Sequence, residues 1–376
     1  MLPQQPKSKP PGLSFRLQSA RAKLPARCVR EPAMIGACAR IALGVLAAGL
    51  ILRLVVMPLT TEAQSTGKPY RVGLVSLGNI DPSVPGPWWQ PFRDAMRELG
   101  YVEGTNLVFR VVAPAGTPER MPGLIREVAR LGVDVFVTTS TRETRAVMEA
   151  APTAPVVMTL VPDPITQGFA KSLARPGGNV TGMTNLVPGL SQKYLELLKE
   201  AVPRLSKVAV VARPGSATLT ETRRELEGAA TALRLGLVIT SIGSARDIQV
   251  SATDFQEILS RAKREGVGGF VAVADPVTYF HRQHLVRAAA TLGLPGMYWS
   301  RDYVADGGLM SYSADLVELR RRVATYVDKI LKGARPADLP VEQPTRFELV
   351  INLRTAKMLG LVIPPSVLAR ADQIIE

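Results

Sequence analysis

The sequence predicts an α/β fold of two lobes, each built around its own parallel sheet. From Tyr70 onward, short apolar runs alternate with amphipathic stretches, a pattern typical of βαβ units whose strands are buried on both faces. Glycine follows the expected helix ends, as in Leu99-Gly100 and Leu131-Gly132, where a left-handed residue closes a helix. The Gly-, Pro- and Asn-containing stretch 182–189 suits a crossover that divides the strands into two sets.

The apolar runs predict ten strands and the amphipathic stretches predict eight helices. The expected strands are 71–77, 106–112, 134–138, 156–160, 180–184, 207–211, 237–242, 268–273, 296–299 and 308–312. The expected helices are 87–99, 118–131, 142–150, 191–202, 219–235, 254–265, 278–292 and 315–332. The first five strands form one set, and the strands between 207 and 299 form a second.

The charge of the chain is concentrated near its beginning. The formal net charge is +14, from 46 Lys/Arg and 32 Asp/Glu. Residues 1–63 hold nine of the basic residues and two of the acids, which leaves 37 and 30 beyond Ala63, a net of +7. The later basic residues are spread evenly, without an aromatic-interleaved stripe, so we expect no nucleic-acid partner.

Residues 1–63 are predicted to be an export signal segment. Residues 41–52 form an apolar run that follows Arg40, and Thr61 and Ala63 place small residues at the −3 and −1 positions of a cleavage site. Residues 1–33 are long and Pro-rich for the start of a signal peptide, so Met34 is an alternative true start. A retained membrane anchor is the other interpretation, although a span needs roughly 20 apolar residues.

Both cysteines, Cys28 and Cys38, lie in this segment. The remainder therefore offers no disulfide, thiolate metal site or thiol nucleophile, and it can fold in an oxidising compartment without mispairing. His281 and His284 lie three apart with no evident third ligand, and phosphate-loop and nucleophile-elbow motifs do not occur. We therefore expect a binding protein with no catalytic residues, no metal and no cofactor.

Ligands of open parallel sheets gather at the carboxyl ends of the strands, so the loops after the strands hold the candidate site. Hydroxyls and free N–H groups in the Thr/Ser cluster at 138–141 are suited to a carboxylate, with N-capping as the alternative role. Aromatic residues are expected to cover an apolar part of the ligand, and acids to pair with a ligand cation. The candidate ligand-binding residues are Ser76, Trp89, Thr139, Ser140, Asp163, Asp275, Tyr279 and Asp302.

Three segments together resemble a known family. Asp-Pro-Ile at 163–165 is followed by LARPGGNVTG at 173–182, and the ending at 347–376 and the first strand and helix at 71–106 match as well. These segments are similar to the substrate-binding proteins of ABC transporters, in the family that includes tryptophan-type binding proteins. The resemblance covers nearly all of 70–376.

The resemblance implies a type I periplasmic-binding-protein fold: two Rossmann-like lobes joined by a three-crossover hinge, with the ligand in the cleft. The first lobe would comprise 70–183 and 307–335, and the second 184–306 and 336–376. Such a protein would be a periplasmic monomer that captures an amino-acid-like or carboxylate-bearing small molecule and delivers it to an ABC transporter permease. A ligand-sensing domain that signals to a membrane partner without transport is the alternative function.

Overall fold

The computed structural model describes residues 68–77, 89–114, 117–185, 187–244 and 250–376. These residues all belong to the second of two units, 65–376, into which the chain divides. The predicted export segment, with Cys28, Cys38 and the alternative start at Met34, lies outside the described residues. In the part of the chain that is described, no helix combines the length and apolar character needed to cross a membrane.

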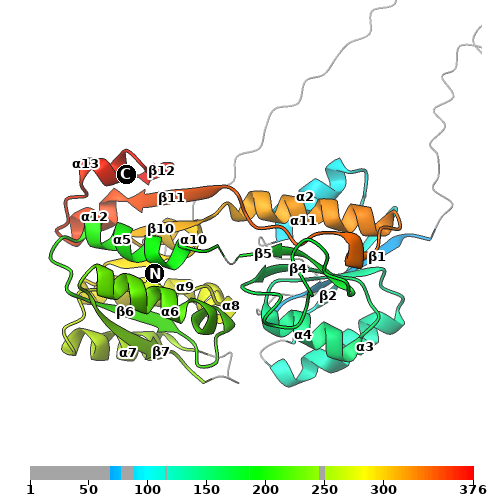
Figure 1. Cartoon of the computed structure of the whole chain (residues 1–376), viewed down its shortest axis with the longest axis horizontal. Coiled ribbons are helices and arrows are strands. Elements are labelled where there is room, and N and C mark those ends of the chain that lie inside the picture. Colours follow the sequence, from blue (N-terminus) through cyan, green and yellow to red (C-terminus); the bar gives the residue numbers. More distant parts are fainter. Residues whose placement is uncertain (1–67, 78–88, 115–116, 186, 245–249) are drawn as a thin grey trace, which may run out of the picture. The chain divides into compact units, whose positions relative to one another are not determined.

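The described strands form two sheets, which confirms the predicted fold class (Figure 1). The first sheet has the order β2-β1-β3-β4-β5, all parallel, and comprises β1 (Tyr70–Val75), β2 (Leu107–Val112), β3 (Val135–Thr138), β4 (Val156–Val161) and β5 (Val180–Thr184). The second has the order β12-β11-β10-β9-β8-β6-β7 and comprises β6 (Lys207–Ala212), β7 (Gly236–Ser241), β8 (Gly269–Ala272), β9 (Gly296–Tyr298), β10 (Met310–Ala314), β11 (Phe347–Asn352) and β12 (Gln373–Ile375). Its strands are parallel except where β10 meets β11.

The helices cover both faces of each sheet. They are α2 (Gln90–Glu98), α3 (Met121–Arg130), α4 (Thr141–Ala150), α5 (Leu190–Ala201), α6 (Ala217–Ala232), α7 (Ala252–Arg264), α8 (Pro276–Phe280), α9 (Arg282–Leu292), α10 (Arg301–Ala305), α11 (Leu316–Leu331), α12 (Leu353–Met358) and α13 (Pro365–Leu368), with 3-10 turns at Pro118–Arg120 and Pro336–Asp338. In the first lobe, α2 and α11 lie on one face of the sheet and α3 and α4 on the other (Figure 1). Val135 and Val137 enter the core under α2 and α11, whereas Phe136 enters the core under α3 and α4. Alternate residues of one apolar run are thus buried on opposite faces, as expected for a parallel sheet.

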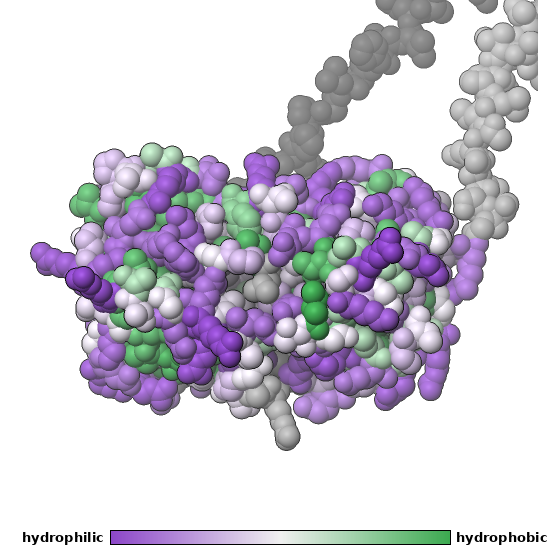
Figure 2. Space-filling view, viewed as in Figure 1, coloured by the Kyte–Doolittle hydropathy of each residue, from purple (hydrophilic) through white to green (hydrophobic). Residues whose placement is uncertain are grey.

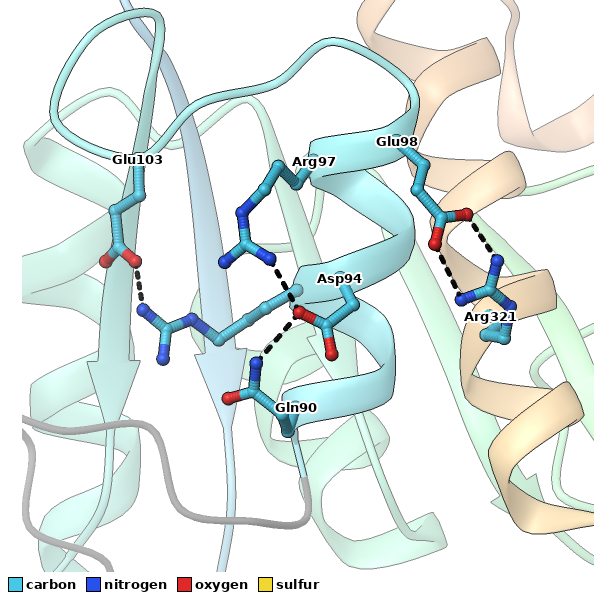
Figure 3. A network of polar contacts seen from close by, with 7 residues as sticks. Gln90, Asp94, Arg97, Glu98, Glu103 and Arg321 are labelled. Atoms are coloured by element: carbon cyan, nitrogen blue, oxygen red, sulfur yellow. Dashed lines mark hydrogen bonds and ion pairs between the residues drawn. The ribbon is translucent and has the colours of Figure 1, made fainter.

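Helices α2 and α11 pack through apolar side chains and carry polar contacts on their exposed sides. Phe92 and Met96 of α2 share a buried cluster with Val323 and Val327 of α11. At the surface, Arg321 of α11 donates two hydrogen bonds to the Glu98 carboxylate of α2, one of 3.1 Å (Figure 3). Exposed ion pairs contribute about 1 kcal/mol or less, so burial of the apolar side chains holds this pair of helices together.

The chain passes between the two sheets three times, which agrees with the predicted hinge. It leaves β5 for α5, returns from β10 to α11, and crosses again before β11. The predicted lobe boundaries at 307 and 336 are wrong by several residues. β10 belongs to the second sheet because it pairs with β9 and β11, and Val341 and Glu342 still lie against the first lobe because they bond to Leu173 and Gly182.

Two further predictions are corrected. The single helix expected at 278–292 is two helices, since α8 ends and α9 begins at His281, whose φ and ψ are −102° and 18°. β11 and β12 were not among the ten expected strands, all of which occur. On the face drawn in Figure 2, hydrophilic side chains predominate and apolar ones form small separate groups, as is usual for a surface in contact with water.

Candidate functional site

A cavity of about 330 Å³ lies where the strands of both sheets end. In the first lobe its lining residues follow β1, β3 and β4, and in the second they follow β6, β8 and β9. Both lobes contribute because parallel strands in each sheet present their carboxyl ends at one edge. The cavity is therefore at the place that the strand-end rule predicts.

The first-lobe wall is formed by the start of α4. Ser140 is the N-cap residue, and its Oγ accepts the backbone N–H of Glu143 at 3.4 Å. Thr139 and Thr141 lie on either side of it and also line the cavity. The Thr141 Oγ1 atom is buried and makes no hydrogen bond to the described residues. The first N–H groups of a helix have no intrahelical acceptor, so this wall is rich in donors.

Glu143 organises this wall from beneath. Its side chain is fully buried, and its carboxylate accepts hydrogen bonds from the backbone N–H of Leu77 at 2.7 Å and from both the N–H and the hydroxyl of Thr139, at 2.5 and 2.7 Å. Burial raises the pKa of Glu143 to about 7, against the opposing effect of these donors. Thr139 is thereby committed to Glu143, whereas the expectation was that its donors would face the ligand.

The second-lobe wall is formed by the turn after β6 and the start of α6. The N–H of Ser216 donates to the carbonyl of Arg213 at 3.1 Å across Pro214-Gly215, and Gly215 has the positive φ of 71° that this turn requires. The turn places Ser216 at the N-cap of α6, where its Oγ accepts the N–H of Leu219. The start of a second long helix is thus directed at the cavity.

Charged side chains from both lobes meet at the cavity. Arg213 is buried and forms an ion pair with Asp275, 3.2 Å from Nε to Oδ2. Arg142 and Arg145 of α4 line the opposite wall. Burial and the positive charge of Arg213 lower the pKa of Arg142 from its ordinary value. The lining is therefore electropositive, which favours an anionic ligand group.

Aromatic side chains form the remaining wall. Tyr279, Phe280 and Trp299 line the cavity, and the Tyr279 and Trp299 rings pack with their centroids 5.5 Å apart. The Tyr279 hydroxyl donates to Asp302 at 2.5 Å. This wall is suited to a planar apolar group of the ligand.

The structure divides the eight predicted residues equally. Thr139, Ser140, Asp275 and Tyr279 line the cavity, and Ser76, Trp89, Asp163 and Asp302 do not. Two of the four that do not line it are buried: Ser76 lies beside Leu77, and Trp89 packs in the core with Phe92. The other two make hydrogen bonds within the protein: Asp163 accepts the N–H groups of Ile165 and Thr166, and Asp302 accepts the Tyr279 hydroxyl. Position after a strand identifies the right loops but does not determine which side chains point into the cavity.

Several important residues were missed by sequence reasoning. Arg142, Arg213 and Trp299 line the cavity but were not among the predicted residues. Glu143 had a recognisable signal, because Ser140 and Glu143 have the spacing of a capping box. Arg213 follows β6 directly and so lies in a loop that the strand-end rule selects. Arg142 had no signal, since charged residues near helix starts are common at any protein surface.

The glycine-rich segment 173–182 has a structural role. The Asn179 side chain donates to the carbonyl of Ala154 at 2.6 Å, and the Thr181 hydroxyl donates to the carbonyl of Leu339 at 2.7 Å. Gly182 has a φ of 127°, and a Cβ there would come within 2.2 Å of the Met158 carbonyl oxygen. The segment therefore fixes β5 against β4 and against the chain that leads to the last crossover.

Comparisons with known proteins agree with this architecture. Residues 88–375 match the family described as "ABC transporter substrate binding protein". The tyrosine-binding protein of Clostridioides difficile strain R20291 is 22% identical over 278 residues, 72% of this chain and 75% of that protein. A conserved domain protein from Vibrio cholerae is 29% identical, with a TM-score of 0.72, over 82% of this chain and 100% of the other. The ABC domain from Streptococcus pneumonia in complex with L-Trp is 24% identical, with a TM-score of 0.71 over the same shares.

Proposed function

Because this chain belongs to the family of ABC transporter substrate-binding proteins, we propose that it captures a small carboxylate-bearing solute between its lobes and delivers it to a membrane permease. The observation that carries the proposal is a cavity that combines two kinds of lining. Arginines and helix starts line it from both lobes, and Tyr279, Phe280 and Trp299 add an aromatic wall. A concave site with a few convergent polar groups and an aromatic wall is typical of small-molecule binding.

The carboxylate is expected to lie against the starts of α4 and α6. Ser140 and Thr141 offer hydroxyls from the first lobe, and Ser216 offers one from the second. Helix N-termini stabilise negative charge through their free N–H groups and the helix dipole. A ligand held by both starts joins the two lobes.

Binding is proposed to close the lobes about the three crossovers. A side-chain hydrogen bond already spans the cleft, from Gln167 of the first lobe to Glu221 of α6 at 3.4 Å. A ligand that contacts both walls interacts more strongly with the closed form, and it therefore shifts the population toward that form. The closed form is the one that the permease would recognise.

The relatives support an aromatic solute. One is named a tyrosine-binding protein, and another, an ABC domain, was solved in complex with L-Trp. In this chain Asp275, the acid that lines the cavity among the described residues, is held by Arg213. That arrangement favours binding over general acid–base catalysis, which needs a group within reach of the proton it transfers.

Substrate-binding proteins of ABC transporters act outside the cytoplasm. We propose accordingly that residues 1–63 direct this chain out of the cytoplasm and that the mature protein is a periplasmic monomer. The composition of the segment supports this role, because the apolar run at 41–52 follows a basic stretch, and small residues lie at Thr61 and Ala63, just before the proposed cleavage point.

A thermal-shift screen of the purified protein tests the proposal. The probes are aromatic and aliphatic amino acids, the matching carboxylic acids, and sugars as a comparison class. A solute that binds the folded state stabilises it by about 2.7 kcal/mol at 100 times its Kd, so the hit raises Tm. A panel in which no small molecule raises Tm would contradict the proposed function.

A matched pair of variants locates the binding. Ala217 lies at the start of α6 and lines the cavity, whereas Ala232 lies exposed at the end of the same helix. Ala217→Phe fills the cavity and should abolish the ligand-induced rise in Tm, and Ala232→Phe should leave it unchanged. An undiminished rise in Ala217→Phe would place the binding site elsewhere.

A further inference from the structure

The charges on the cavity wall do not balance. Three arginines line it, Arg142 and Arg145 from the first lobe and Arg213 from the second. Among the described lining residues the acid is Asp275. Before any ligand enters, the described wall therefore carries an excess of positive charge.

Asp275 is already engaged by the protein. Its Oδ2 accepts Nε of Arg213 at 3.2 Å, and its Oδ1 accepts the N–H groups of Val277 and Thr278 at 2.8 and 3.3 Å. The side chain is 7% exposed. Asp275 thus neutralises Arg213 and caps α8, which leaves little capacity to hold a ligand cation.

Within the described part of the chain, neither Arg142 nor Arg145 forms an ion pair of this kind, and the carboxylates of Glu119 and Asp275 act on Arg142 only through longer-range electrostatics. The Nη1 atom of Arg142 is buried without a hydrogen bond to any described residue. Arg145 donates to the carbonyl and side-chain oxygens of Gln167, which are neutral. A buried donor without an acceptor costs free energy, more so when the group is charged, and a ligand that supplies the acceptor removes that cost.

From this imbalance we propose that the solute carries net negative charge: an aromatic carboxylic acid without a charged α-amino group. This inference rests on the proposed function and narrows its solute class. A carboxylate satisfies Arg142 and the start of α4. An ammonium group beside the carboxylate would face the arginines. It would also need a hydrogen-bond acceptor, and Asp275, the acid among the described lining residues, is already paired with Arg213.

A preference for a solute without an α-ammonium would distinguish this protein from the relatives described with tyrosine or L-Trp. A zwitterion has no net charge, so it leaves the excess positive charge of this wall uncompensated. Like charges in a partly desolvated site repel strongly enough to exclude a partner. The α-ammonium is therefore the group that this cavity selects against.

Calorimetry with matched probes tests the inference directly. L-Tryptophan and indole-3-propanoate share the ring and the carboxylate and differ by the α-ammonium, as do L-phenylalanine and 3-phenylpropanoate. Tryptamine keeps the ring and the cation but lacks the carboxylate. The desamino acids should bind at least about tenfold more tightly than the amino acids, a difference of about 1.4 kcal/mol, and tryptamine should not bind.

Two variants and one control test which residues cause the preference for the acid over the amino acid. Arg142→Gln should weaken binding of indole-3-propanoate by about tenfold and reduce the ratio between acid and amino acid. Arg126→Gln, on an exposed position of α3, is the control and should change neither. Asp275→Asn retains a residue that caps helices well and removes the charge, so the acid should bind at least as tightly as before.

The outcomes separate the two proposals. If L-tryptophan or L-phenylalanine binds as tightly as its desamino acid, the inference is overturned while the proposed function stands. The inference is also overturned if Asp275→Asn abolishes amino-acid binding and leaves the acid unaffected, or if none of the aromatic probes binds. Failure of every small molecule in the wider screen would overturn the proposed function itself.

Discussion

The hydroxyl of Tyr279 donates a 2.5 Å hydrogen bond to Oδ2 of Asp302. This bond orients the ring that forms part of the cavity wall. Arg320 of α11, in the first lobe, also donates a hydrogen bond to Tyr279, and burial lowers the pKa of Arg320 to about 10. Tyr279 therefore connects the ligand wall of the second lobe to the helix that follows the second crossover.

Tyr279→Phe should weaken solute binding by about tenfold. The ring remains, but it loses the bond that orients it, and Arg320 loses an acceptor that helps to join the lobes. Stability should fall by about 1–3 kcal/mol, because buried charged groups lose a partner. Calorimetry and urea unfolding measure the two effects.

Tyr101→Phe is the matched control. Its hydroxyl donates to Asp328 at 2.9 Å, and the residue is as buried as Tyr279 but lies in the first lobe away from the cavity. A comparable loss of stability is expected with no change in affinity. Equal affinities for the two variants would show that the Tyr279 bond has no role in binding.

Glu143→Gln should flatten the pH dependence of stability. The pKa of Glu143 is raised from an ordinary 4.5 to about 7, mainly by burial. Its stabilising contribution is thus fully present below pH 4.5 and is lost as the pH rises through 7, a change of about 3 kcal/mol. The glutamine cannot ionise, so urea unfolding at pH 4.5 and pH 8 should show a smaller difference in the variant.

Glu127 on the exposed side of α3 provides the comparison. Glu127→Gln should retain the full difference in unfolding free energy between the two pH values. If Glu143→Gln shows the same pH profile as Glu127→Gln, the buried carboxyl does not titrate in this range.

Ser140→Ala and Ser251→Ala should separate capping from binding. Both serines are N-cap residues that accept an N–H of their helix, Ser140 at α4 on the cavity and Ser251 at α7 outside its lining. Each substitution should cost about 1 kcal/mol of stability. Affinity should fall for Ser140→Ala alone; a drop in both variants would point to a general loss of folding instead.

Mass spectrometry of the exported protein tests whether the export signal segment, residues 1–63, is removed. Removal of residues 1–63 predicts a mature chain that begins near Gln64. Recovery of residues 41–52 in the mature protein would favour a retained anchor.

The sequence predicted the architecture well because apolar periodicity reports directly on burial. The continuous apolar runs at 134–138 and 207–211 predicted strands covered on both faces, and the structure confirms them as Val135–Thr138 and Lys207–Ala212. β12 has three residues, Gln373–Ile375, which is too short to show any periodicity. The lobe boundary was misplaced because nothing in the sequence of β10 indicates which sheet it joins.

The site was predicted in part, for a related reason. The strand-end rule located Ser140 and Asp275 through topology alone. It also selected Trp89, whose ring is buried in the core. In the sequence, an aromatic residue near a loop looks the same whether it packs in the core or contacts a ligand. The contribution of Arg142 depends on the position of Arg213, more than 70 residues later in the chain, and only the folded structure brings the two together.

Small-angle scattering with and without the solute tests the central claim that the two lobes close around a small molecule. The cavity is lined by both lobes, so a ligand that bridges them should hold them together. We predict a smaller radius of gyration at saturating solute, and no decrease for Ala217→Phe under the same conditions. An unchanged radius of gyration in the parent protein, with calorimetry showing full occupancy, would contradict the account.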